Sequence, residues 1–385
     1  MTLPRIPVSI LTGFLGAGKS TLLNRLLKDP AMRDAAVIIN EFGEVGIDHL
    51  LVETSNDAVV ELSDGCLCCT VRGELVDTLA ELVDGMQTGR IKPLSRVVIE
   101  TTGLADPAPV MQSVMGHPAI AQSFDLDGVV TVVDAVNVLA TLDAHAEAYR
   151  QVAVADRLIL TKKTLASAEE IARVERRLRE INPRAPITDG DLEAAARAEI
   201  LVNGLYDPAT KIADVDRWLR DEVAHDHHHH HHHHDDHDHE PGHGHAHHGH
   251  HHHHHDVNRH GASIRSYSIV HDTPIDPMAI NMFVDLLRST HGEKLLRMKA
   301  IVALTDRPEK PLVLHGVQSI FHPPVRLPAW PEGSDRKTRL VLITKDLSET
   351  YVRELFDAFT GKVSIDRPDR QAMTDNPLAV PGFKF

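Results

Sequence analysis

"PVSILTGFLGAGKS", residues 7–20, is the stretch that decides the fold of this 385-residue chain. An apolar run leads into the spacing G-x-x-x-x-G-K-S, and leucines at helical spacing follow directly. A strand, a glycine-rich turn and a helix in this order aim backbone N–H groups at a bound phosphate. We therefore predict a phosphate-binding loop that comprises Gly13, Phe14, Leu15, Gly16, Ala17, Gly18, Lys19, Ser20 and Thr21.

Catalysis of phosphoryl transfer needs a cation at this loop and an acidic group on a neighbouring strand. We expect Lys19 to reach the β and γ oxygens of a nucleoside triphosphate, and the Ser20 hydroxyl to coordinate Mg²⁺. "RVVIETTG" ends an apolar run with Glu100, which would hold Mg²⁺ through water or polarise the attacking water. Gly103 would let the backbone approach the γ-phosphate. Lys19 and Glu100 are the catalytic candidates, although a strand-end carboxylate that merely faces solvent is the competing interpretation.

A third element should recognise the base. In many GTPases it is Asn-Lys-x-Asp after a strand, where the Asp accepts hydrogen bonds from guanine N1–H and N2–H. Here the apolar run "RLIL" leads into "TKKT", residues 161–164. Thr161 and Lys162 remain candidates for nucleotide contact, but Thr164 offers no carboxylate, which predicts a reduced preference for GTP over ATP. Asp134, at another strand end, is considered for Mg²⁺ support or a switch.

Short apolar runs alternate with helix-like segments through the first half of the chain, which predicts a parallel sheet with helices on both faces. Beyond residue 260, a strand-like segment, a helix and further apolar runs favour a smaller α+β domain. The apolar runs lie at 36–39, 59–62, 96–99, 129–133, 158–160, 299–304, 312–316 and 340–343, and the helix-like segments at 19–28, 73–83, 168–181, 278–287 and from Ser348. The fold class is thus α/β, with the parallel sheet of a P-loop NTPase and a smaller C-terminal α+β domain.

Residues 225–255 interrupt this pattern and hold 21 of the 29 histidines of the chain. Such a segment buries too little apolar surface to offset its ordering entropy, so we expect disorder. Most imidazoles are neutral at pH 7 and can bind metal, which favours a flexible metal reservoir over a passive linker. The expected organisation is a P-loop domain over 1–224, a His-rich linker over 225–260, a C-terminal domain over 261–365 and a tail over 366–385.

Composition limits the cellular context. The formal net charge of −15 argues against a nucleic-acid partner, whose phosphates need a positive surface. No apolar run approaches the length of a membrane span, and the first residues lack the pattern of a signal peptide. All three cysteines lie within "CLCC", residues 66–69, which is typical of a reducing compartment. We expect a cytoplasmic protein without a nucleic-acid or membrane partner.

Several stretches together resemble the CobW-type metallochaperone GTPases, relatives of the nickel-insertion GTPases of urease and hydrogenase maturation. The resemblance extends through residues 263–360, which look like the C-terminal domain of that family. The matching stretches are "GFLGAGKSTLLN" (13–24), "NEFGEVGID" (40–48), "GCLCCT" (65–70), "ETTGLADP" (100–107) and "VVTVVDA" (129–135). One departure is Thr164, where the family usually has Asp.

The resemblance implies a GTPase that uses GTP, Mg²⁺ and Zn²⁺ and transfers its metal to a client metalloprotein. Triphosphate and Mg²⁺ would order residues 40–48 and 64–70 together, and hydrolysis would release them. A nucleotide-dependent homodimer is considered as an assembly. Alternatives are a cobalt-handling GTPase of cobalamin synthesis, an ATP-dependent enzyme, and a non-catalytic zinc storage protein whose function lies in its histidines.

The metal ligands expected are Cys66, Cys68 and Cys69, because thiolates bind Zn²⁺ well and adjacent buried cysteines would pack poorly on a strand. Three thiolates leave a fourth position for Glu44, Glu41, a water or a side chain of the client. An incomplete site of this kind can release its metal, whereas a closed four-ligand site would be structural. Cu(I) and cobalt are the alternative metals.

Overall fold

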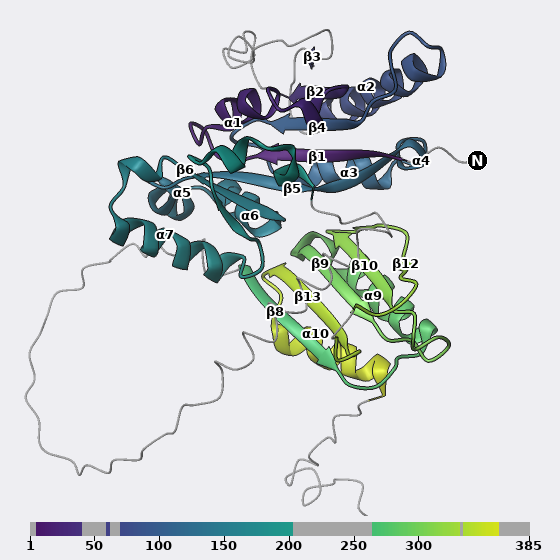
Figure 1. Ribbon diagram of the computed structural model, residues 1–385. Helices are drawn as coiled ribbons and strands as arrows, with labels where there is room; N and C mark the ends of the chain where they lie inside the picture. The colour runs from purple at the N-terminus through teal and green to yellow at the C-terminus, as the bar shows by residue number, and fades with distance from the viewer. Residues whose placement is uncertain (1–4, 41–58, 62–69, 203–263, 332–333, 362–385) are drawn as a thin grey trace, which may run out of the picture.

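The computed structural model describes residues 5–40, 59–61, 70–202, 264–331 and 334–361. Two sheets organise these residues (Figure 1). The first contains seven strands in the order β3-β2-β4-β1-β5-β6-β7, and every neighbouring pair is parallel. The strands are β1 (Ile6–Thr12), β2 (Ala35–Asn40), β3 (Val59–Glu61), β4 (Arg96–Thr101), β5 (Phe124–Asp134), β6 (Arg157–Thr161) and β7 (Ile187–Asp189).

Helices cover both faces of this sheet, which confirms the predicted fold. On one face, Leu22, Leu23 and Leu26 of α1 pack with Val37 and Val130 of the strands. On the other face, leucines of α2 and α7 join the alternate strand residues in a second core. The helices are α1 (Lys19–Leu26), α2 (Thr70–Gln87), α3 (Ala108–Gly116), α4 (Ile120–Ser123), α5 (Val138–Ala144), α6 (Ala146–Val154) and α7 (Ala168–Ile181).

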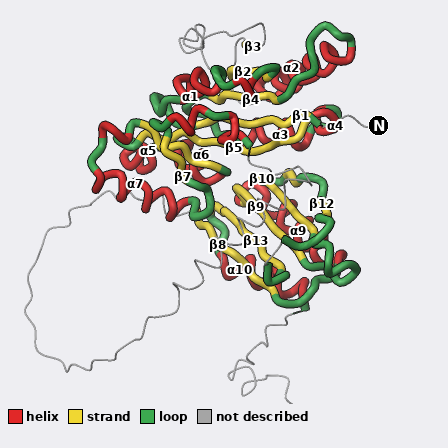
Figure 2. The backbone as a smooth tube through the Cα atoms, in the orientation of Figure 1, coloured by secondary structure: helices red, strands yellow, loops and turns green. Residues whose placement is uncertain are grey.

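The second sheet is antiparallel and belongs to the smaller C-terminal unit (Figure 2). Its order is β11-β10-β9-β13-β8, with β12 beside β10, and two helices bury Phe283 and Phe356 against it. The elements are β8 (Ile264–His271), α9 (Pro277–His291), β9 (Leu295–Val302), β10 (Leu312–Val317), β11 (Ile320–Phe321), β12 (Val325–Arg326), β13 (Thr338–Lys345) and α10 (Glu349–Thr360). None of the helices within the described residues is long and apolar enough to cross a membrane.

A buried ionic cluster joins the two units. Asp156, directly before β6, contacts the guanidinium of Arg297 and lies 2.7 Å from the Lys299 ammonium, both on β9. Burial alone would raise the pKa of Asp156, but the two cations outweigh it and hold that pKa well below its ordinary value. The carboxylate is therefore charged at neutral pH, and it fixes the C-terminal sheet to the end of α6.

Candidate nucleotide site

The phosphate loop has the backbone geometry that its glycines predict. Gly16 and Gly18 adopt positive φ angles of 73° and 96°, which residues with a Cβ rarely reach. Gly13 is required by packing, because a Cβ there would lie 2.3 Å from the Val132 carbonyl oxygen on β5. The loop leads into α1, whose first residue Lys19 is buried, with its ammonium 3.5 Å from the Phe14 carbonyl oxygen.

The predicted acidic strand end lies beside this loop. Glu100 is aligned with Leu11 on the neighbouring strand, and the Ser20 hydroxyl donates a 3.2 Å hydrogen bond to its Oε1 atom. A serine hydroxyl and a carboxylate are hard oxygen donors of the kind that Mg²⁺ binds, so these two side chains fit the expected metal. Thr21, by contrast, lies exposed on the first turn of α1.

The loop after β4 contacts the phosphate loop closely. A Cβ on Gly103 would come within 2.6 Å of the Leu15 backbone nitrogen, so only glycine fits at this approach. Gln151 of α6 is buried and donates to the carbonyl oxygens of Gly103 (3.1 Å) and Ala105 (2.9 Å). The same helix that supports this loop ends at the ionic cluster with the C-terminal sheet, so α6 physically connects the two.

A small, mostly apolar pocket lies between the phosphate loop, β5 and helices α5 and α6. Phe14 and Leu15 contribute to its wall, Asp134 and Asn137 are among its polar residues, and neither Lys19 nor Ser20 lines it. The pocket is therefore separate from the side of the loop where the phosphate groups are expected.

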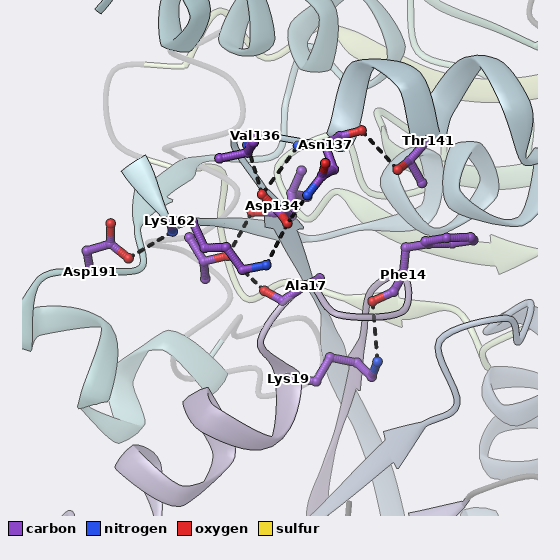
Figure 3. Close-up of polar contacts among 11 residues, drawn as sticks. Phe14, Ala17, Lys19, Asp134, Val136, Asn137, Thr141, Lys162 and Asp191 are labelled. Carbon is purple, nitrogen blue, oxygen red and sulfur yellow. Dashed lines mark hydrogen bonds and ion pairs between the residues drawn. The ribbon is translucent and has the colours of Figure 1, made fainter. Parts of the chain in front are cut away.

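The turn after β6 is tied directly to the phosphate loop. The Thr161 hydroxyl lies 2.7 Å from the carbonyl oxygen of Ala17, so threonine joins the two segments at the first position of the base motif. Lys162 has a positive φ of 58°, and its ammonium lies 2.7 Å from Asp134 Oδ2 at the end of β5 (Figure 3). The structure thus places Asp134 beside the turn at 161–164, where it contacts Lys162.

Asp134 also supports the start of α5, because it accepts hydrogen bonds from the Val136 N–H (2.8 Å) and the Asn137 amide (2.9 Å). Burial would raise the pKa of Asp134, but the hydrogen bonds from Lys162, Asn137 and Val136 outweigh it and lower that pKa. Asp134 is therefore ionised at neutral pH, and it positions the Lys162 side chain.

A further acidic residue beside this turn, Asp191, was not expected from the sequence. Asp191 follows the short strand β7, and its carboxylate accepts hydrogen bonds from the N–H groups of Lys162 (3.0 Å) and Thr164 (3.3 Å). Figure 3 shows its side chain directed at the backbone of Lys162. The available signal was the turn-forming "DGD" of residues 189–191, directly after a brief apolar segment.

The candidate metal ligands Cys66, Cys68, Cys69 and Glu44 lie outside the described residues, as do Glu41 and the histidine tract. Among the residues that are described, no group of three or more His, Cys, Asp or Glu side chains is arranged to hold a metal ion. The zinc site therefore stays a prediction from the sequence.

A parallel sheet whose first strand leads into a glycine-rich loop, with a buried lysine and a serine in contact with an acidic strand end, defines a P-loop nucleoside triphosphatase. Residues 7–189 match the model of the CobW/HypB/UreG nucleotide-binding domain, and residues 264–360 match that of the C-terminal domain of cobalamin synthesis protein CobW. The chain belongs to the CobW/HypB/UreG family.

Its relatives include the zinc chaperone YjiA of Escherichia coli, 32% identical over 354 residues that cover 91% of this chain and 98% of that protein. The zinc-regulated GTPase metalloprotein activator 1 of Schizosaccharomyces pombe is 35% identical over 56% of this chain and 51% of its own length. Among solved structures, zinc-bound YjiA GTPase from E. coli superposes with a TM-score of 0.60 at 26% identity, covering 93% of this chain and 99% of that one.

Proposed function

We propose that this protein is a GTPase that binds zinc and couples GTP hydrolysis to the transfer of zinc to a client protein. The observation that carries the proposal is the 3.2 Å contact between Ser20 and Glu100, beside the buried Lys19. Relatives with this architecture are named as zinc chaperones and as a GTPase that activates metalloproteins. The nucleotide site and these names together support the assignment.

Each residue of the phosphate end has a role that follows from its chemistry. The backbone N–H groups of residues 14–20 would bind the phosphate oxygens, and Lys19 would neutralise the charge that develops on the γ-phosphate. Ser20 and Glu100 would hold Mg²⁺, which when bound stabilises negative charge on the phosphate oxygens. Glu100 would also orient the attacking water, and Gly103 would bring its backbone to the γ-phosphate.

The sheet register supports a link between this site and the cysteine motif. Glu61 of β3 and Glu100 of β4 are both aligned with Ile39 of the strand between them. The chain therefore leaves β3 at the level of the acidic strand end, two strand spacings or about 10 Å away. Residues 62–69, which include the three cysteines, start there and lead into α2.

Zinc is the cargo in this proposal. Cys66, Cys68 and Cys69 would bind it as thiolates, with Glu44 as the fourth ligand, and the histidine tract would hold further metal near the site. Coupling requires that the zinc affinity differ between the GTP and GDP states, because equal affinity would transmit nothing. The protein would act in the cytoplasm and deliver zinc to a client metalloprotein. It would form a homodimer that depends on the bound nucleotide.

The proposed GTPase activity is tested by measuring phosphate release from GTP with the wild-type protein and with the isosteric variant Glu100→Gln. We expect turnover to fall by about 10²–10⁴-fold, because the amide neither holds Mg²⁺ nor polarises water as a carboxylate does. Glu169→Gln, an exposed position on α7, is the matched control and should hydrolyse GTP normally. Undiminished turnover in Glu100→Gln would remove Glu100 from the site.

A further inference from the structure

The base end of the site contains a carboxylate that the sequence motif lacks. We infer that Asp191 is the residue that selects guanine, supplied by the loop after β7 in place of an aspartate at position 164. The inference rests on the proposed function, since it names the determinant of base specificity for the same nucleotide site. It departs from the weak GTP preference that Thr164 alone predicts.

The position of the Asp191 carboxylate is the first argument. Its Oδ2 atom lies 3.3 Å from the Thr164 backbone nitrogen, and its Oδ1 atom lies 3.0 Å from that of Lys162. These two contacts hold the carboxylate against the backbone of the turn that also carries Thr164. The turn expected to face the base therefore has a carboxylate beside it, although Thr164 itself carries no charge.

The second argument is that the loop carrying Asp191 is held tightly. Arg25 of α1 donates to the carbonyl oxygens of Gly190 (2.5 Å) and Leu192 (2.6 Å), and the Gly190 N–H donates to the Leu160 oxygen at 2.7 Å. A Cβ on Gly190 would lie 2.8 Å from the Thr161 side chain, so glycine alone permits this approach to β6. The loop is therefore anchored to α1, to β6 and, through Asp191, to the turn at 161–164.

The third argument is that the Asp191 carboxylate can accept further hydrogen bonds. Asp134 and Asp189 each face a lysine ammonium, at 2.7 Å and 3.0 Å, whereas Asp191 is exposed and accepts hydrogen bonds from two backbone N–H groups. A carboxylate has about four acceptor positions, so two backbone donors leave room for two more. Guanine presents N1–H and N2–H as an adjacent pair of donors, and adenine presents no such pair.

The test is equilibrium binding of non-hydrolysable GTP, ATP and xanthosine triphosphate analogues to the full chain at fixed Mg²⁺. Wild type should prefer the guanine analogue, and Asp191→Asn should weaken its binding about ten- to hundredfold. The same variant should bind the xanthine analogue more tightly than wild type does, because an amide N–H can donate to the xanthine C2 carbonyl while the amide oxygen accepts from N1–H. Glu193→Gln, an exposed carboxylate at the start of the 3-10 helix that follows this loop (Glu193–Ala196), should change neither affinity.

Asp191→Asn with unchanged guanine affinity overturns the inference. Equal losses for the guanine and xanthine analogues also overturn it, since they would show that Asp191 only supports the turn. Binding without hydrolysis by wild type would instead contradict the proposed GTPase while leaving the base assignment intact. Thr164→Asp adds a separate check: it should gain little selectivity, because it places a second negative charge beside Asp191.

Discussion

The phosphate end and the base end of the nucleotide site are built in different ways. The phosphate end comes mainly from one continuous stretch, residues 13–20, joined by Glu100 from the adjacent strand. The proposed base end is assembled from the ends of three strands: Asp134 is the last residue of β5, the turn at 161–164 begins with the last residue of β6, and Asp191 follows β7. A contiguous motif can be recognised from sequence spacing, whereas a site assembled from separate loops depends on the fold that brings them together.

The largest expected effect is at the phosphate end. Lys19→Ala should reduce GTP turnover by about 10²–10³-fold or more, because it removes a charge that stabilises the transition state, and base selectivity should be unchanged. Phosphate release and thermal unfolding are the measurements, with the exposed Lys28→Ala as the control. Near-normal turnover in Lys19→Ala would contradict the claim that the contiguous motif at residues 13–20 forms the phosphate end of the site.

The Thr161 hydroxyl joins the turn at 161–164 to the phosphate loop, so its loss should weaken the binding of every nucleotide to a similar extent. Thr161→Val leaves the buried Ala17 carbonyl without its 2.7 Å donor, and the free energy of unfolding should fall by about 1–3 kcal/mol. Affinities for GTP and ATP should fall together, in contrast to the base-selective effect of Asp191→Asn. Thr161→Ser keeps the hydroxyl and should behave much more like wild type, as denaturant titrations and binding would show. A purely GTP-selective loss would instead place Thr161 at the base.

A smaller effect is expected from the ion pair that positions Lys162. The lowered pKa of Asp134 means that its charged form stabilises the folded state at pH values above the ordinary Asp pKa of about 4. Wild type should exceed Asp134→Asn in free energy of unfolding at neutral pH. The difference should shrink as the pH falls below about 4 toward the lowered pKa, as urea titrations between pH 7 and pH 3 would show. A pH-independent difference would mean that packing, and not charge, is what Asp134 contributes.

The contrast between contiguous motifs and sites assembled from separate loops also explains which parts of the structure the sequence predicted. The helix expected at 168–181 is observed over the same residues, because Ser167 and Glu170 form a capping box that marks its start. Strand β7 was missed because three residues show no periodicity, and Asp191 was missed with it.

Long-range pairing explains another error. The strand expected at 299–304 is observed at Leu295–Val302, four residues earlier at its start. Arg297 interrupts the apolar pattern before the expected run, and its burial is compensated by Asp156 and the Val154 carbonyl oxygen, more than 140 positions away in the chain. Local patterns therefore predicted the elements and the phosphate loop, but not the charges that neutralise each other across the fold.

The central claim is that the nucleotide state controls zinc affinity, and one titration tests it most directly. Zinc binding should be measured by competition with a chromophoric chelator at fixed Mg²⁺, with GDP and with a non-hydrolysable GTP analogue. We predict affinities that differ by about tenfold or more between the two states, which corresponds to a coupling free energy of about 1.4 kcal/mol. The difference should disappear when Cys66, Cys68 and Cys69 are replaced together by Ser. Equal zinc affinity of the wild-type protein in both nucleotide states would contradict the account.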